Sequence, residues 1–228
     1  MQLVFVRNDR TVCHKLGAVK GQPARSAVYP RPMADVVGIV LGAGASRRLG
    51  RPKQTLPLGD TTLLGWVLRE VEASRLDRVV LVLGGAADEA RAALHPTRAE
   101  IVSNADYGSG CASSLLAGLD AAGRPEAAML VLGDMPGVDA RLIDAVRDDW
   151  QRHRPWACVT DYRGEPGHPL IFSAAAFGDL RALHGDKAVW KLLDTYPERF
   201  RAVPVDEPLP RDVDTWGDYA AVRRRLGV

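Results

Sequence analysis

A length of 228 residues is sufficient for one large α/β domain with a full hydrophobic core. A formal net charge of +2 provides no global positive field of the kind that attracts nucleic acid, and no apolar run is long enough to predict a membrane span. Cys13, Cys111 and Cys158 are widely spaced, which argues against a disulfide framework and a CxxC metal site and favours a reducing cytoplasm.

The first 32 residues differ in composition from the rest. They mix Gly, Pro and basic residues without clear periodicity, and they lack the layout of a secretory signal. Met33 lies just before the first strong strand pattern and would be a natural start. We therefore predict that residues 1–32 form a disordered extension or an over-long start assignment, which an intact-mass spectrum of the native product would distinguish. Residues 33–228 are expected to form a single domain.

The chain after Met33 alternates apolar runs with amphipathic stretches. Apolar runs predict buried strands at 36–41, 79–83, 100–102 and 127–132. Apolar residues at helical spacing predict helices at 62–73, 86–94, 113–122 and 139–150. This alternation implies a three-layer, Rossmann-like α/β fold, with a mostly parallel sheet, right-handed crossovers and helices on both faces.

The C-terminal third is less regular. It predicts two strands around a Gly/Pro-rich connection in 154–172, a turn entering a helix in 182–193, an edge strand at 203–205 and a helix at 216–226. Thr215 is placed to cap the last helix, with Asp218 at its third position as the partner in a capping box.

Residues 36–59 combine a predicted strand, a glycine-rich loop and a cluster of cations. Its first strand runs into Gly42, Ala43 and Gly44, where small residues let the backbone approach a ligand and form an anion-binding concavity. Four cations follow within seven positions: Arg47, Arg48, Arg51 and Lys53. A glycine loop with clustered cations predicts binding of several phosphates.

Two standard phosphate-binding fingerprints do not fit this loop. The dinucleotide pattern GxGxxG would need glycine at Arg47, and the P-loop pattern would need Lys-Ser/Thr after Gly50, where Arg51 and Pro52 stand. The sequence of residues 41–53 instead resembles the nucleotidyltransferase loop L-[AG]-[AG]-G-x-[SG]-x-R-[ML]-G-x-x-K.

Carboxylates occur where a ligand of such a sheet would lie. Ligands of open parallel sheets bind beyond the carboxyl ends of the strands, and Asp134 directly follows the strand at 127–132. Beside a triphosphate, a carboxylate there predicts Mg²⁺, although a turn Asp bonded to its own backbone is the alternative. Asp212 and Asp214 alternate around Val213, so both would point the same way. We take Asp214 as the second metal ligand and Asp212 as a reserve.

The sequence does not determine the role of His168. His168 lies in a Gly-His-Pro sequence immediately before an apolar run. It could contact an acceptor substrate, orient the loop, or do neither.

The motifs together resemble a known family. LGAGASRRLGRPK, GSGCASSLLAGL, VLGDMPG, GHPLIF, LHGDKAVWKLL and DVDTWGDY occur in the order found in MobA-like nucleotidyltransferases, in particular the molybdenum cofactor cytidylyltransferase branch. The resemblance covers residues 35–226. It implies a fold of the nucleotide-diphospho-sugar transferase type and transfer of CMP from CTP to molybdopterin, with release of pyrophosphate.

The same resemblance implies roles for individual residues. Arg48 and Lys53 would hold the triphosphate and neutralise charge at the α-phosphorus, and Asp134 and Asp214 would hold Mg²⁺. The nucleotide pocket would be lined by Leu41, Ala43, Gly44 and Ser114. The Ala43-Gly44 pair favours CTP over GTP, whereas Gly42 and Leu49 depart from the usual pattern.

Other functions stay open from the sequence. One is a GTP-dependent or sugar-phosphate nucleotidyltransferase, another is an NAD(P)H-dependent oxidoreductase that uses the glycine loop, and a third is a non-catalytic binder that serves a molybdoenzyme. A molybdoenzyme that receives the cofactor is the expected protein partner of the transferase.

Overall fold

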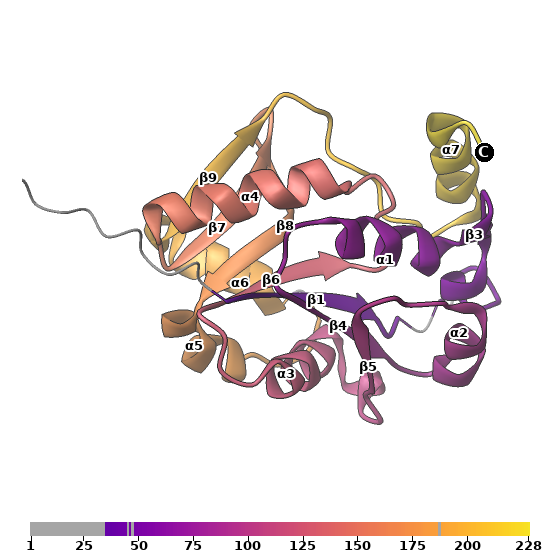
Figure 1. Cartoon of the computed structure of the whole chain (residues 1–228), viewed down its shortest axis with the longest axis horizontal. Helices are drawn as coiled ribbons and strands as arrows, with labels where there is room; N and C mark the ends of the chain where they lie inside the picture. Colours follow the sequence, from indigo (N-terminus) through magenta and orange to yellow (C-terminus); the bar gives the residue numbers. More distant parts are fainter. Residues whose placement is uncertain (1–34, 45, 47, 187) are drawn as a thin grey trace, which may run out of the picture. The chain divides into compact units, whose positions relative to one another are not determined.

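The computed structural model describes residues 35–44, 46, 48–186 and 188–228. The predicted extension at 1–32, and Arg47 among the predicted cations, lie outside the described residues. Within residues 35–228 a central sheet is covered by helices on both faces (Figure 1), which confirms the predicted α/β fold. No helix in this described part of the chain is long and apolar enough to cross a membrane.

The sheet has seven strands in the order β5-β4-β1-β6-β8-β7-β9. In chain order they are β1 Val36–Gly42, β4 Arg78–Leu83, β5 Ala99–Ser103, β6 Ala127–Leu132, β7 Ala157–Tyr162, β8 Glu165–Ser173 and β9 Phe200–Val205. All neighbouring strands pair in parallel except β8, which is antiparallel to both β6 and β7. A short separate hairpin is formed by β2 Pro57–Leu58 and β3 Thr61–Thr62.

The helices divide between the two faces because alternate residues of each strand point to opposite sides. The helices are α1 Leu63–Ala73, α2 Ala87–Ala93, α3 Cys111–Ala122, α4 Ala140–His153, α5 Phe177–Arg181, α6 Ala188–Thr195 and α7 Trp216–Leu226. In β1, Val36 and Val40 pack in a core with α1 and α4, whereas Val37, Ile39 and Leu41 pack in a core with α3, α5 and α6. Figure 1 shows α1 and α4 on one side of the sheet and α3 and α5 on the other.

The last helix forms a third, smaller core. Leu56, Leu58 and Leu63 from the hairpin region pack with Val213, which precedes α7, and with Val222 of α7. The start of α7 has the predicted capping box: the Asp218 N–H donates to Thr215 Oγ1 at 3.2 Å, and Asp218 Oδ2 accepts the Thr215 N–H at 2.9 Å. This box holds the segment that carries Asp214 at the edge of the domain.

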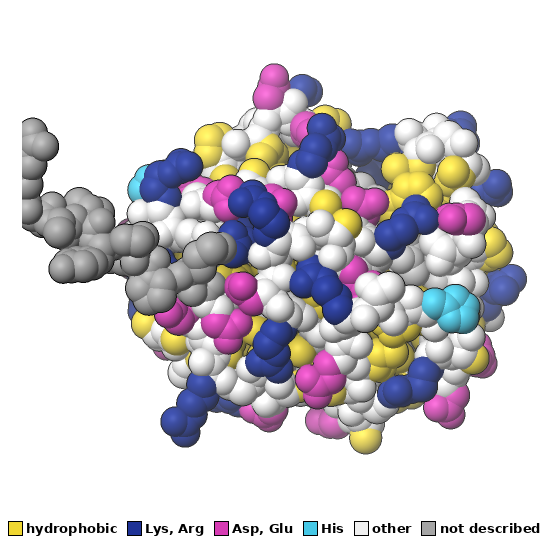
Figure 2. Space-filling model, in the orientation of Figure 1, with side chains coloured by type: hydrophobic (Ala, Val, Ile, Leu, Met, Phe, Trp, Pro, Cys, Tyr) yellow, Lys and Arg dark blue, Asp and Glu magenta, His cyan; other side chains and the backbone are white. Residues whose placement is uncertain are grey.

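The surface carries charges of both signs. On the face seen in Figure 2, Lys and Arg side chains alternate with Asp and Glu rather than gathering by sign. This distribution agrees with the small net charge of the sequence.

Candidate active site

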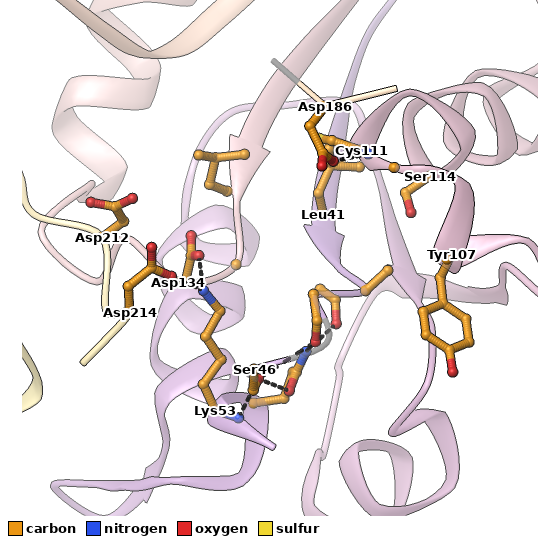
Figure 3. Close-up of a pocket in the computed structure, with 18 of the residues that line it drawn as sticks. Leu41, Ser46, Lys53, Tyr107, Cys111, Ser114, Asp134, Asp186, Asp212 and Asp214 are labelled. Carbon is orange, nitrogen blue, oxygen red and sulfur yellow. Dashed lines mark hydrogen bonds and ion pairs between the residues drawn. The ribbon is translucent and has the colours of Figure 1, made fainter. Parts of the chain in front are cut away.

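A cavity of about 660 Å³ lies at the carboxyl ends of β1 and β6, the edge at which a ligand was predicted. Eight of the nine predicted site residues line it, and only His168 does not. The eight are Leu41, Ala43, Gly44, Arg48, Lys53, Ser114, Asp134 and Asp214. Figure 3 shows Asp134, Asp212 and Asp214 on one side of this cavity and Ser114 and Tyr107 on the other.

Gln54, which carries no recognisable signal in the sequence, holds the glycine loop. The buried Gln54 amide donates to the carbonyl oxygens of Gly42 at 2.9 Å and Gly44 at 2.8 Å. Ser46, in a left-handed conformation with φ of 52°, accepts the Lys53 N–H at 2.8 Å. These bonds tie the loop to the short helix that carries Lys53, so loop and cation keep one geometry.

Close contact between two strand ends brings Asp134 to the loop. The Gly133 N–H donates to the Leu41 carbonyl at 2.9 Å. A Cβ at Gly133 would lie 2.7 Å from a Leu64 methyl carbon and 2.9 Å from the Leu41 oxygen, so glycine allows the approach. The C-terminal segment is fixed to the same place because the Val213 N–H donates to the Asp134 carbonyl at 3.0 Å.

Lys53 is the electrostatic centre of the cavity. Its side chain is largely buried, and Nζ lies 2.5 Å from Asp134 Oδ2 and 2.9 Å from Asp214 Oδ1 (Figure 3). Arg48, which is exposed, also donates to Asp214. Burial acts to lower the pKa of Lys53, but the two carboxylates outweigh it and raise that pKa above its ordinary value. Lys53 is therefore charged at neutral pH.

The two carboxylates differ in their surroundings. Burial raises the pKa of Asp134, and the nearby Asp212 and Asp214 raise it further against the opposing effect of Lys53. For Asp214, burial acts in the same direction, but Lys53 and Arg48 outweigh it and lower its pKa. Asp134 is thus the carboxylate that gains most from an additional cation.

These residues fit a divalent cation that arrives with phosphate. Asp134 and Asp214 already converge on one positive charge, the Lys53 ammonium. Within the described residues, no group of three or more His, Cys, Asp or Glu side chains is placed to hold a metal alone. One or two carboxylates completed by phosphate oxygens are the usual ligands of Mg²⁺. The donor set therefore suits a metal shared with a nucleotide better than a resident one.

The opposite wall of the cavity is organised by Asn104, also missed in the sequence. Its buried amide donates to Ser113 Oγ at 2.9 Å and Ser114 Oγ at 3.0 Å in the first turn of α3. Ser114 lines the cavity, as predicted, and Tyr107 lines it from the loop after β5. Asn104 directly follows β5, and a polar residue at the end of a strand is the sequence feature that could have identified it as a site residue.

His168 lies outside this cavity. It is only 4% exposed, and burial lowers its pKa to about 4, so the imidazole is neutral at physiological pH. Its ring meets Trp190 edge-on at a centroid distance of 5.3 Å. A role for His168 in acceptor binding stays a prediction.

The chain resembles known proteins over most of its length. Residues 38–201 match the family described as the MobA-like NTP transferase domain. The chain is 32% identical over 190 residues to nicotine blue oxidoreductase of Paenarthrobacter nicotinovorans, covering 79% of this chain and 92% of that protein. It is 31% identical over 146 residues to molybdenum cofactor cytidylyltransferase of Escherichia coli K12, covering 62% and 71% of the two chains.

Solved structures agree with this result. Rv0371c from Mycobacterium tuberculosis H37Rv is 38% identical, with a TM-score of 0.77, over 85% of this chain and 100% of that one. The same protein in complex with manganese is similar with a TM-score of 0.71 and 35% identity over the same shares of the two chains. These similarities confirm the expected fold of the nucleotide-diphospho-sugar transferase type.

Proposed function

The chain belongs to the MobA-like NTP transferase family, and on that premise we propose that it transfers CMP from CTP to molybdopterin and releases pyrophosphate. The description of the family as an NTP transferase domain supports nucleotidyl transfer. The observation that carries the proposal for this chain is the buried Lys53 ammonium between Asp134 and Asp214, beside a glycine loop in one cavity.

In the proposed reaction, Arg48 and Lys53 hold the triphosphate of the nucleotide. Phosphate oxygens replace the two carboxylates as partners of the Lys53 ammonium, and Asp134 and Asp214 would then be free to hold Mg²⁺. The metal, when bound, adds charge neutralisation at the phosphates. The phosphate of the acceptor is already a nucleophile, so positioning and charge neutralisation supply most of the rate without a strong general base.

The choice of nucleotide and acceptor has separate support. Leu41, Ala43, Gly44 and Ser114 line the cavity and would contact the nucleotide. The resemblance of the Ala43-Gly44 pair to the cytidylyl branch favours cytosine. The relative from Escherichia coli is named as a molybdenum cofactor cytidylyltransferase. The name of this relative supports an acceptor of the molybdopterin type.

Pyrophosphate release tests this proposal. Purified protein is incubated with Mg²⁺ and molybdopterin, and with CTP or GTP in parallel. We expect release that depends on both CTP and acceptor and is lost in Asp134→Ala. A preference for GTP would retain the mechanism and reject the cytidylyl assignment, while no release with either nucleotide in folded protein would reject both.

A second candidate is an NAD(P)H-dependent oxidoreductase. It is favoured by the relative named nicotine blue oxidoreductase, which the chain covers almost completely. The cavity argues against it, because a buried lysine shared by two carboxylates suits a metal triphosphate better than a nicotinamide ring. Titration of NADPH fluorescence distinguishes the two: saturable binding that CTP does not displace would support the oxidoreductase.

Further expectations follow from the transferase. We propose that residues 33–228 form its single catalytic domain, that it acts in the cytoplasm, and that a molybdoenzyme receives its product. Limited proteolysis tests the domain boundaries. Fractionation of cells that express the native gene tests the location, and affinity capture with a tagged molybdoenzyme tests the partner. A catalytic core that fails to survive removal of residues 1–32 would contradict the first.

A further inference from the structure

A second, smaller pocket lies beside the nucleotide cavity. It has a volume of about 170 Å³, and Cys111 and Leu132 line both hollows. Its other walls come from four elements, and include Leu115 of α3, Leu130 of β6, His168 of β8, and Val189 and Trp190 of α6. The shared wall brings the small pocket within reach of a molecule bound in the large cavity.

His168 is the residue of this pocket that carries a ring nitrogen able to accept a hydrogen bond; Trp190 carries an indole N–H, and the others are apolar or carry a thiol. Its Nε2 is buried and has no hydrogen-bond partner within the described part of the chain. Leaving a buried polar atom unpaired costs about 1–3 kcal/mol, and most such atoms in proteins are paired. An unpaired nitrogen in the wall of a pocket points to a ligand atom as its partner.

The order of strands in the sheet indicates which of the two substrates this pocket binds. The phosphate loop follows β1, Asp134 follows β6, and His168 lies on β8, on the far side of β6 from β1. Ser114 of α3 lines the large cavity, and Asn104, which follows β5, donates a hydrogen bond to it. Both residues therefore lie toward β5, on the opposite side of β1 from β8. A nucleotide spanning β1 and its neighbours thus leaves the β8 side for the second substrate.

We propose that this pocket is the acceptor subsite and holds one six-membered ring of a flat heteroaromatic acceptor, with a ring atom hydrogen-bonded to His168 Nε2. The remainder of the acceptor extends past Leu132 toward Asp134. There an oxygen of its phosphate attacks the α-phosphorus of CTP, the bond between the α- and β-phosphates breaks, and pyrophosphate leaves. The proposal rests on the proposed function, because it assigns the second substrate of that reaction.

Size and shape agree with a ring. A cavity of about 150 Å³ lined by apolar side chains is known to admit benzene, and this pocket is of similar volume. The His168 and Trp190 rings meet at 90°, so they form two flat walls at a corner. Aromatic ligands pack favourably against such edges and faces.

Binding of free pterin tests the subsite without catalysis. Pterin is the probe because it is fluorescent and carries a heteroaromatic ring but no phosphate. Fluorescence anisotropy gives its Kd for the full chain and for His168→Leu, His168→Gln and Val189→Phe. We expect about tenfold weaker binding in His168→Leu, from loss of one buried hydrogen bond, and a similar loss in Val189→Phe, which fills the pocket.

Matched controls make the result decisive. His95→Leu removes an exposed histidine outside the pocket and should leave the Kd unchanged, and His168→Gln, which keeps a polar atom, should weaken binding less than His168→Leu. Thermal unfolding shows which variants are folded. An unchanged Kd in folded His168→Leu and Val189→Phe would overturn the proposal.

Kinetics separate failure of the subsite from failure of the proposed function. If molybdopterin supports pyrophosphate release, the two variants should raise its KM about tenfold and leave the KM for CTP unchanged. Release with an unaltered acceptor KM would reject the subsite alone. Pterin binding that depends on His168 and Val189, with no release from any nucleotide, would reject the transferase and keep the ring site.

Discussion

Among single residues, Lys53 makes the largest contribution to the proposed mechanism. One buried ammonium satisfies two carboxylates in the protein as it stands, and it is the group that a triphosphate would recruit. Replacing it removes the charge that a transferring phosphate needs. It also leaves Asp134 without its cation and Asp214 paired with Arg48 alone. Both effects act on the same site, so Lys53 should dominate any mutational series.

We predict that Lys53→Met lowers kcat/KM for CTP by on the order of 10²–10³, by analogy with the loss of a single preorganised donor. Lys191→Met, which removes an exposed lysine on α6 away from the cavity, is the matched control and should be close to wild type. Steady-state pyrophosphate release measures both. A folded Lys53→Met protein with wild-type kcat/KM would remove Lys53 from the mechanism.

The buried His168 makes a separate prediction about stability. Its folded pKa of about 4 lies below the ordinary value of 6.5, so the unfolded chain binds the extra proton first as pH falls. The native state therefore loses stability between pH 6.5 and pH 4, by up to about 3 kcal/mol from this group.

Urea unfolding of the wild type and His168→Gln at pH 7 and pH 4.5 measures this term. The loss of unfolding free energy on acidification should be smaller in His168→Gln, and it should be unaltered in the control His95→Gln. Equal losses in the wild type and His168→Gln would mean that His168 does not titrate as its burial requires.

Among the secondary-structure elements, α7 helps to position Asp214, although no residue of α7 itself lines the cavity. The capping box of Thr215 and Asp218 begins the helix directly after Asp214, and the Val213 N–H is bonded to the Asp134 loop. Disturbing the cap should thus affect stability first and the site second.

We predict that Thr215→Ala lowers the free energy of unfolding by about 1 kcal/mol, the usual contribution of an N-cap side chain. Thr215→Ser keeps the hydroxyl and serves as the control, with a much smaller loss. Urea denaturation measures both, and equal stability of Thr215→Ala and the wild type would show that the cap is not needed for α7.

Most of the central strands could be predicted from the sequence, but the direction of one of them could not. Long apolar runs predicted β1, β4 and β6 to within about a residue, because burial on both faces leaves little ambiguity. The antiparallel direction of β8 was not predicted. It follows from the tight turn at Arg163 and Gly164, both with positive φ, which forces a hairpin with β7.

The predicted site residues were those with a signal of their own. Glycines, clustered cations and aspartates at strand ends carry chemistry that can be recognised in a sequence. Gln54 and Asn104 were missed because an amide that bonds to loop carbonyls or serine hydroxyls resembles any surface amide until the fold buries it. His168 was noticed, but only the fold shows that it faces a pocket beside the main cavity.

At the scale of the whole molecule, the sheet edge combines segments far apart in sequence into one charged cavity. Lys53 comes from the segment after β1, Asp134 from the end of β6, and Asp214 from the segment before α7. Since the two aspartates need phosphate oxygens to complete a metal site, metal binding and nucleotide binding should be coupled.

We predict that the protein alone binds Mn²⁺ weakly and that CTP strengthens this binding at least about tenfold, with EDTA abolishing activity and Mg²⁺ restoring it. Electron paramagnetic resonance of free Mn²⁺ measures the binding. Asp134→Asn should remove most of the CTP-dependent gain, whereas Asp144→Asn, on α4 and outside the cavity, should retain it. Tight Mn²⁺ binding without nucleotide would contradict the shared site.

Transfer of a labelled phosphate tests whether this cavity moves a nucleotidyl group. CTP labelled at the α-phosphate is incubated with Mg²⁺, molybdopterin and the wild-type protein or Asp134→Asn, and the products are separated. We expect the label to appear on the acceptor with wild type and at a rate lower by on the order of 10² or more with Asp134→Asn. Label that stays in CTP with the wild-type protein, or an equal rate of transfer in the variant, would contradict the account.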